Sequence, residues 1–327
     1  MSFFAFEKIE MMPMLKVISP GFLTTVQDLG RFRFAHLGVS PAGAADGFAS
    51  RLGNLLVNND ANTSALEMTL IGGSFEFESN SLIAITGADC GPTLDDEALP
   101  MWTSMVVRAG QTLKCGAMKT GARCYLCVHG GINVEKIMAS ASTHVQTGIG
   151  GWQGRRPLKK GDALPIAEIP REAKHHSCTV RKDLINYLYE KSTIGVTPGP
   201  QSDFFSRESL RIFSSTPYLV SESSNRVGLR LKGESIARGK SEELITEGLS
   251  LGAVQVPPDG QPIILFVEHP TTGGYPKIAN VISADFCRVG QLKPRDEVRF
   301  QFVSFDQATE LLLRQHTLLT RESLVPR

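Results

Sequence analysis

The segment "AVQVPPDGQPIILFVEHPTTGGYPKIANVI", residues 253–282, carries the clearest fold signal in the chain. Two apolar runs rich in β-branched residues flank a Pro-Asp-Gly turn, which is the pattern of two antiparallel strands joined by a short loop. A polar stretch from Glu268 to Lys277 follows the second run. The segment therefore predicts a β-hairpin followed by a polar, glycine-containing loop.

Short strands are also predicted on both sides of this hairpin. They are "GSFEFES", "SLIAITGA", "SMVVRAG", "RCYLCVHGG" and "DEVRFQFVS", and glycine or proline turns separate them. Helix patterns are few: one covers residues 43–58, and another covers 304–315, where Ser304 and Gln307 form a predicted capping box. Many short strands with few crossover helices favour a mainly β fold, with antiparallel sheets closed into barrels and a few short helices plugging or flanking them.

Chain length and a change of pattern near mid-chain indicate two halves. At 327 residues the chain exceeds most single cores. An irregular, charged segment from Ala167 to Asp183 interrupts the strands, so we predict halves at 14–170 and 195–318, with the boundary near residues 167–197. Residues 1–13 are read as an extension. The final "LVPR", residues 324–327, resembles the remnant of a thrombin-cleavable tag and is excluded from the fold reasoning.

Composition excludes several classes of function. A formal net charge of +1 gives no electrostatic footprint for nucleic acid or an anionic membrane. No apolar run reaches membrane-spanning length, and the N-terminus lacks a signal-peptide pattern. The six scattered cysteines lack the density of a disulfide-stapled domain, so we expect a soluble protein of the reducing cytoplasm.

The loop "TTGGYPK" and its neighbour are predicted to form a ligand site. Consecutive glycines allow close approach of backbone N–H groups to an anion, and a lysine adds positive charge. A nearby loop supplies amide and carboxylate groups that suit a small polar amide. The predicted site consists of Gln255, Asp259, Gln261, Thr272, Gly273, Gly274, Tyr275 and Lys277, with Asp259 and Lys277 as catalytic candidates. The alternative is a tight hairpin turn with a surface lysine. As part of the ligand site, Lys277 is also taken to be exposed, so Lys277→Ala is expected to change stability by no more than about 0.5 kcal/mol.

Polar residues in the N-terminal half form a second group of candidates. Gln27, Asp28 and Arg31 lie beside glycines, and Asp46 begins the first predicted helix. Arg155, in the basic loop "GIGGWQGRRPLKKGD", could hold a carboxylate or phosphate through two hydrogen bonds. Structural alternatives are an Asp28–Arg31 ion pair, a favourable interaction of Asp46 with the helix dipole, and a solvated basic turn.

No metal site is predicted. Cys124 and Cys127 are separated by an odd number of positions, so on a strand they point to opposite faces. His175, His176 and Cys178 lie in a charged segment without a second pair of ligands, which favours an exposed linker.

Several motifs together resemble the allophanate hydrolase subunit 2 family. In chain order they are "SPGFLTTVQDLGR", "GVSPAGAAD", "LEMT", "CYLCVHGGI", "GGWQGR", "NRVGLRL", the opening segment extended to "ISAD", and "QLKPRDEVRF". The resemblance runs from about Met14 to about Leu312. It departs from the family at residues 139–143, where "ASAST" replaces the usual Gly-Ser-Arg-Ser-Thr.

The resemblance implies a fold, partners and an activity. It implies two cyclophilin-like β-barrel halves and a partner similar to allophanate hydrolase subunit 1, the B-type or KipI-like subunit. In 5-oxoprolinase systems such B-type and C-type subunits act with an A-type subunit to convert 5-oxoproline to glutamate at the expense of ATP. The expected function is therefore the C-type subunit of an ATP-dependent 5-oxoprolinase, inactive alone. The alternatives are a KipA-like regulatory protein that binds a KipI-type partner and a carboxyltransferase component that uses carboxybiotin carried elsewhere.

Overall fold

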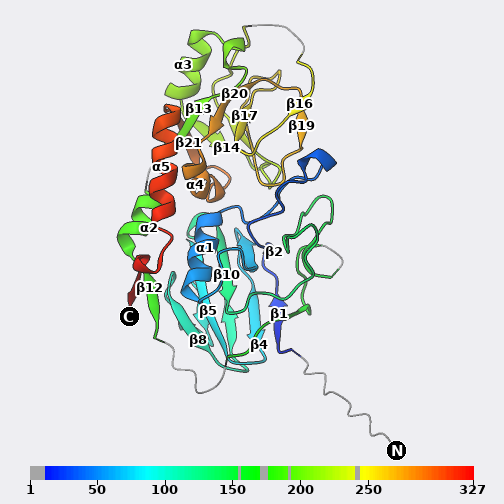
Figure 1. Cartoon of the computed structure of the whole chain (residues 1–327), viewed down its shortest axis with the longest axis vertical. Helices are drawn as coiled ribbons and strands as arrows, with labels where there is room; N and C mark the ends of the chain where they lie inside the picture. The colour runs from blue at the N-terminus through cyan, green and yellow to red at the C-terminus, as the bar shows by residue number, and fades with distance from the viewer. Residues whose placement is uncertain (1–11, 154–155, 170–175, 191–192, 240–243) are drawn as a thin grey trace, which may run out of the picture.

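The structure is a computed structural model, and it consists of two halves stacked along the long axis of the molecule (Figure 1). The residues it describes are 12–153, 156–169, 176–190, 193–239 and 244–327. The predicted mainly β character is confirmed, and the strands lie in antiparallel sheets and one closed barrel.

The N-terminal half contains two sheets. The six-stranded sheet has the order β11 (Ala163–Pro165), β1 (Met14–Ser19), β4 (Ser74–Phe77), β9 (Thr112–Lys114), β6 (Thr93–Leu94) and β7 (Glu97–Ala98). The five-stranded sheet has the order β2 (Leu23–Gln27), β3 (Ala65–Thr69), β10 (Thr120–Val128), β5 (Ser81–Asp89) and β8 (Ser104–Val107). Apolar side chains from both sheets, such as Phe75 of β4 and Leu126 of β10, share one core.

Strand β10 distributes its side chains to two cores. Cys124 and Leu126 point into the core between the two sheets, whereas Tyr125 and Cys127 point to the opposite face. This confirms that Cys124 and Cys127 face opposite ways, as the odd spacing predicts. Helix α1 (Gly47–Leu56) covers the second face and packs on β5 and β10.

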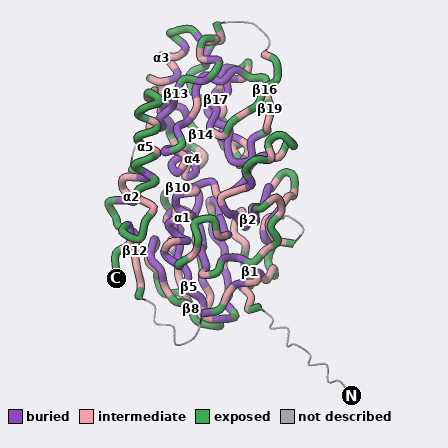
Figure 2. Tube along the Cα trace, viewed as in Figure 1, coloured by how far each residue is buried: buried purple, intermediate pink, exposed green. Residues whose placement is uncertain are grey.

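The C-terminal half is built on a closed seven-stranded barrel. Its order is β13 (Thr193–Pro198), β20 (Lys277–Val281), β17 (Ala253–Gln255), β18 (Ile263–Leu265), β15 (Gly228–Lys232), β14 (Tyr218–Val220) and β21 (Glu297–Phe302). The predicted hairpin is present, because β17 pairs with β18 in an antiparallel register. A buried apolar core fills the barrel and forms the purple interior of the upper half in Figure 2.

Within the described ranges, five α-helices flank the sheets. They are α1 (Gly47–Leu56), α2 (Lys182–Tyr189), α3 (Arg207–Ser215), α4 (Phe286–Gly290) and α5 (Phe305–Thr317), and short 3-10 turns lie at Ala35–Leu37, Ser202–Phe204, Ser283–Asp285 and Arg321–Ser323. Both helices predicted from sequence are present. The predicted capping box at the start of α5 is confirmed, with reciprocal hydrogen bonds between Ser304 and Gln307.

Two small two-stranded sheets complete the fold. One pairs β16 (Glu247–Gly248) with β19 (Thr272–Gly273), and the other pairs β12 (Cys178–Val180) with β22 (Leu324–Pro326). Residues of the final segment 324–327, which was left out of the fold reasoning as a tag remnant, thus form a strand. Backbone hydrogen bonding explains the pairing, since the Arg327 N–H also donates to the Ser177 carbonyl at 2.9 Å. Among the described residues, no helix has the length and apolarity needed to cross a membrane.

Candidate functional site

The polar residues of the opening segment separate into two places. The loop after β17 and the start of β20 lie at the same end of the barrel, because Gln255 is the register partner of Lys277. Glu268 and His269 follow β18 and lie instead toward the N-terminal half, where the Glu268 carboxylate accepts from the Val145 N–H at 3.1 Å. The polar stretch therefore serves two sites rather than one.

Lys277 lies at the end of the barrel and is buried, with only 3% of its surface exposed. The expectation of an exposed lysine is wrong, because the first residue of β20 points its side chain under strand β16. Its ammonium group pairs with the carboxylate of Glu247, which also accepts from the Gln201 side chain at 2.6 Å. The hydrogen bond and the positive charge of Lys277 lower the pKa of Glu247. Glu247 is itself 43% exposed, so this charged pair opens to solvent on one side.

The glycine loop lies against this pair. Gly273 is the register partner of Glu247, and a Cβ at Gly273 would lie 3.3 Å from the Gln255 amide nitrogen. Gln255 is buried, with its amide nitrogen 3.5 Å from the Tyr275 carbonyl. The structure therefore brings together Gln255, Gly273 and Lys277, while Thr272, Gly274 and Tyr275 are exposed beside them.

Asp259 and Gln261 belong to the same end of the barrel but make their contacts elsewhere. The Gln261 side chain bonds both the N–H and the carbonyl of Gly233, at 2.9 and 3.2 Å. The Asp259 carbonyl accepts from Ser235, and its carboxylate accepts from the Gln261 N–H. These bonds fix the Pro-Asp-Gly turn to the 233–235 loop, and no described contact joins either side chain to Lys277.

A buried ion network joins the two halves. Arg226, from the turn before β15, donates to Glu268 at 2.5 Å and pairs with Glu67 of β3. Its third nitrogen donates to the Gly43 carbonyl at 2.7 Å. All three side chains are at most 4% exposed. Buried charges of this kind are stable only when they are paired and hydrogen-bonded, so the network depends on both halves being present.

Asp46 is joined to this network through its backbone, because its N–H donates to the Tyr125 hydroxyl, which donates to Glu67. It is the N-cap of α1 and accepts from the Phe48 and Ala49 N–H groups. Its second oxygen accepts from Tyr189 at 2.8 Å and from Gln291 at 2.7 Å. Complete burial raises the pKa of Asp46 to about 6, against the opposing effect of these hydrogen bonds. The predicted position at the start of the helix is confirmed, and the side chain also ties α1 to α2 and α4.

Asp28 and Arg31 do not form the ion pair considered from sequence. The Asp28 carboxylate accepts from the hydroxyls of Ser140 and Ser142, both at 2.6 Å, and from the Ala141 N–H at 2.7 Å. It thus holds the "ASAST" segment, where the family usually carries an arginine. Gln27 is buried nearby and donates to Thr25 and Thr143.

Arg31 is buried with most of its hydrogen-bonding capacity unused. One terminal nitrogen donates to the Ser142 carbonyl, while Nε and the other terminal nitrogen have no acceptor among the described residues. Burial lowers the pKa of Arg31, and the charges of Asp28 and Glu268 oppose this effect. A nearly enclosed guanidinium with free donors suits an anionic group.

His144 lies close to Glu268. Its Nε2 is 2.8 Å from the Ser40 hydroxyl, and its Nδ1 is 3.6 Å from the Glu268 carboxylate. Burial lowers the pKa of His144, so the ring is neutral at pH 7 and Glu268 finds its counter-charge in Arg226.

Two sequence candidates lie outside the described residues, namely Arg155 and His175. Within the described part of the chain, no group of three or more His, Cys, Asp or Glu side chains is arranged to hold a metal ion.

Sequence reasoning missed Glu67, Arg226, His144 and Glu247. Arg226 and Glu67 are 159 positions apart, so no local pattern relates them. One signal in the sequence could have indicated this pair. An arginine and a glutamate lie inside the otherwise strand-like motifs "NRVGLRL" and "LEMT", and a charged side chain in a buried strand needs an oppositely charged partner.

Comparison with known proteins defines the class. Residues 37–302 match the family model of the carboxyltransferase domain, subdomain A and B, and the chain belongs to this family. The predicted family membership is thereby confirmed.

Particular relatives are of two kinds. The chain is 42% identical to the C subunit of 5-oxoprolinase from Escherichia coli over 90% of this chain and 93% of that protein, and 35% identical to the same-named protein of Haemophilus influenzae over 91% and 94%. It is 36% identical to urea amidolyase of Saccharomyces cerevisiae, covering 91% of this chain but 17% of that protein. The crystal structure of K. lactis urea amidolyase matches 99% of this chain and 21% of that chain, with a TM-score of 0.87 and 30% identity.

Proposed function

We propose that this chain is the C-type subunit of an ATP-dependent 5-oxoprolinase, which opens 5-oxoproline to glutamate. The observation that carries this proposal is the match to two bacterial proteins named as the C subunit of 5-oxoprolinase. Each match covers at least 90% of this chain and at least 93% of the relative. The ring amide of 5-oxoproline is stabilised by resonance, and phosphorylation of its oxygen by ATP would make the carbon open to attack by water. The substrate is an anion, so the complex needs cationic and amide groups to hold it.

Lys277 and its neighbours are the groups that we assign to substrate or phosphate. The Lys277 ammonium has one described acceptor, Glu247, on a short and exposed strand. A ligand carboxylate or phosphate can therefore take the place of Glu247 without unfolding the barrel. In this proposal Gln255 recognises the amide and the N–H groups of Gly273 and Gly274 face the oxyanion.

The remaining predicted residues are assigned either to the edges of this cleft or to a second group in the N-terminal half. We assign Thr272 and Tyr275 to contacts with the ligand rim. Asp259 and Gln261 border the same end of the barrel, with Asp259 proposed for proton handling and Gln261 for amide recognition. Arg31, with its free donors, and Arg155 are assigned to a second anionic group, together with Gln27, Asp28 and Asp46 as supporting residues.

A B-type subunit is proposed to cover the cleft, and an A-type subunit to complete the enzyme in the cytoplasm. Exposed apolar side chains at the edge of the cleft support the assignment of a protein partner. Ile245 is 89% exposed and Tyr275 is 46% exposed. Continuing the antiparallel register of β16 and β19 sets these two side chains opposite each other, beside Lys277. Apolar side chains at the edge of a charged site suit a protein partner that excludes water.

The fold proposal is that both halves, 14–170 and 195–318, are cyclophilin-like. The closed barrel of the C-terminal half supports this. The two N-terminal sheets that share one core support it as well.

The test is reconstitution from separately purified A-type, B-type and C-type proteins. We expect glutamate release that requires ATP, 5-oxoproline and all three proteins. Full glutamate release by the A-type and B-type proteins without this chain would reject the proposal.

The second candidate function is a carboxyltransferase component, which the family description and the likeness to K. lactis urea amidolyase favour. In that case the complex would transfer a carboxyl group from carboxybiotin to an amide substrate. Transfer of labelled carboxylate from a carboxylated biotin carrier, without glutamate release from 5-oxoproline, would decide for this function.

A further inference from the structure

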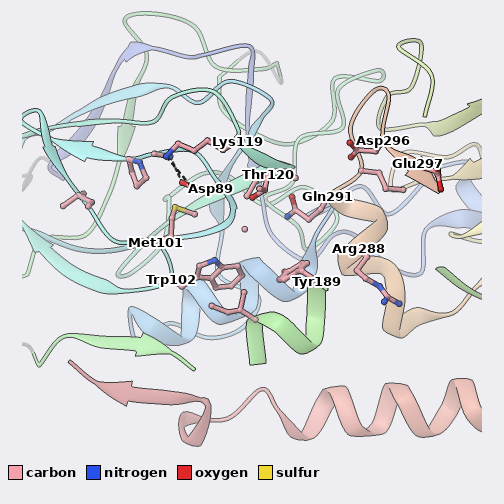
Figure 3. Close-up of a pocket in the computed structure, with 18 of the residues that line it drawn as sticks. Asp89, Met101, Trp102, Lys119, Thr120, Tyr189, Arg288, Gln291, Asp296 and Glu297 are labelled. Atoms are coloured by element: carbon pink, nitrogen blue, oxygen red, sulfur yellow. Dashed lines mark hydrogen bonds and ion pairs between the residues drawn. The ribbon is translucent and has the colours of Figure 1, made fainter. Parts of the chain in front are cut away.

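A cavity of about 850 Å³ lies between the two halves (Figure 3). The N-terminal sheets contribute the turn after β5, the segment before β8 and the start of β10. The other walls come from α2, the start of β13, α4 and the start of β21. Binding sites for small organic molecules have volumes of this size, and they often lie at the boundary between two folded units. None of the lining residues belongs to the group around Lys277.

Trp102 forms one wall together with Tyr189. Their ring centroids are 6.0 Å apart with planes tilted by 48°. Trp102 has φ of +58°, in the left-handed region that bulky residues rarely adopt, so the backbone at this residue is in a disfavoured conformation. No described residue provides an acceptor for its indole N–H. The wall therefore offers an aromatic surface and a free hydrogen-bond donor.

The polar groups at the back of the cavity are already used. The Gln291 nitrogen donates to Asp46 and to the Arg123 carbonyl, and its oxygen accepts from the Ala122 and Arg123 N–H groups at 3.1 Å. The Tyr189 hydroxyl also donates to Asp46. These bonds fix the wall and leave little there to recognise a charge.

The carboxylates that line the cavity lie at its rim, and each has a lysine or arginine partner. Asp89 is 3.4 Å from Lys119, Asp296 is 3.6 Å from Lys293, and Glu297 is 2.8 Å from Arg299. Arg288 is buried and one of its terminal nitrogens pairs with Asp285, while Nε and the other terminal nitrogen have no acceptor among the described residues. In Figure 3 its guanidinium points away from Trp102 and Tyr189, so these free donors are not directed at the aromatic wall. Three carboxylates line the opening, against Lys119 and an arginine that is turned away. This arrangement disfavours an anionic ligand.

We propose that this cavity binds a small, uncharged, planar aromatic molecule with a hydrogen-bond acceptor directed at the Trp102 indole N–H. The remaining wall supports an apolar ring, with Leu99, Met101 and Ile194 among its members. Because both halves line the cavity, a bound molecule stabilises their association and raises the melting temperature by mass action. The proposal does not depend on the proposed enzymatic function.

The test uses the full chain and prodan, an uncharged naphthalene dye with a carbonyl acceptor. We expect saturable binding of one dye per chain, with blue-shifted emission and a higher melting temperature. The anionic dye anilinonaphthalene sulfonate should bind at least tenfold more weakly. Absence of saturable prodan binding, or tighter binding of the anionic dye, would overturn the proposal.

Matched variants locate the bound dye. Thr120→Phe and Ala98→Trp add bulk at two exposed positions on the cavity wall, and each should weaken prodan binding at least tenfold. Thr309→Phe, on exposed α5 away from the cavity, should bind as the wild type does. Trp102→Phe keeps an aromatic ring but removes the N–H, and it should weaken binding several-fold. Unchanged binding by the folded Thr120→Phe and Ala98→Trp proteins would show that the dye lies elsewhere and reject the proposed site.

Discussion

Asp46 shows how one buried carboxylate couples the fold to pH. Its pKa is raised from 3.8 to about 6, chiefly by burial. Between these values the folded state keeps the proton and the unfolded state has lost it. The stabilisation is therefore fully present below pH 3.8 and is lost as pH rises through 6, with a limit of about 3 kcal/mol.

Replacement of Asp46 by asparagine should remove this contribution. Asparagine retains an N-cap oxygen for Phe48 and Ala49. We expect the wild type to lose stability between pH 4 and pH 7 relative to Asp46→Asn, as measured by urea unfolding across that range. Asp60→Asn, at an exposed position, should leave the wild-type profile unchanged. Parallel profiles for wild type and Asp46→Asn would contradict this account.

At the scale of elements, the start of α5 provides a measurable local contribution. Ser304 accepts from the Gln307 N–H at 3.1 Å, and Gln307 accepts from the Ser304 N–H at 2.9 Å. Ser304→Ala should lower the free energy of unfolding by about 1 kcal/mol. Thr309→Ala, in the middle of the same exposed helix, should change it by less than about 0.5 kcal/mol. Equal effects in chemical denaturation would mean that the cap does not stabilise α5.

Elements with a local signal were predicted well, and elements defined by a distant partner were not. The capping box and the alternation of Cys124 and Cys127 can be read within a few residues. The pairing of Leu324–Pro326 with Cys178–Val180 depends on backbone groups almost 150 positions apart in the sequence, and no side-chain pattern marks it. Closure into a barrel was predicted, but the order in which the strands pair around it was not, because that order depends on distant partners.

At the scale of the whole molecule, the Arg226 network holds the halves together. Removing the guanidinium leaves the buried Glu268 carboxylate without its arginine and leaves Glu67 with only the more distant Arg123, at 3.8 Å. Arg226→Met should therefore cost about 3 to 5 kcal/mol of stability. The exposed pair of Arg211 and Glu208 provides a control, and Arg211→Met should cost less than about 1 kcal/mol. Thermal melts of the two variants compare these effects, and a loss below 1 kcal/mol in Arg226→Met would contradict the structural role.

The sequence predicted only part of the group around Lys277, because that group is assembled by strands that are distant in the sequence. Gln255, Gly273 and Lys277 meet because β17 and β20 are barrel neighbours. Glu247, the partner of Lys277, comes from a strand of two residues with no recognisable pattern. Burial of the lysine also depends on that strand, which is why its sequence context suggested an exposed side chain.

Turnover by the reconstituted complex with Lys277→Met tests the central claim most directly. Methionine keeps the length of the buried side chain and removes its charge, so we expect a stability loss of about 1 kcal/mol and normal binding of the B-type subunit. If the ammonium group stabilises an anionic transition state, glutamate release should fall by about thirtyfold to a thousandfold, corresponding to about 2 to 4 kcal/mol. Lys232→Met, at an exposed lysine of β15, should retain wild-type turnover. Wild-type glutamate release from a folded, partner-bound Lys277→Met protein would contradict the assignment of Lys277 to the active site.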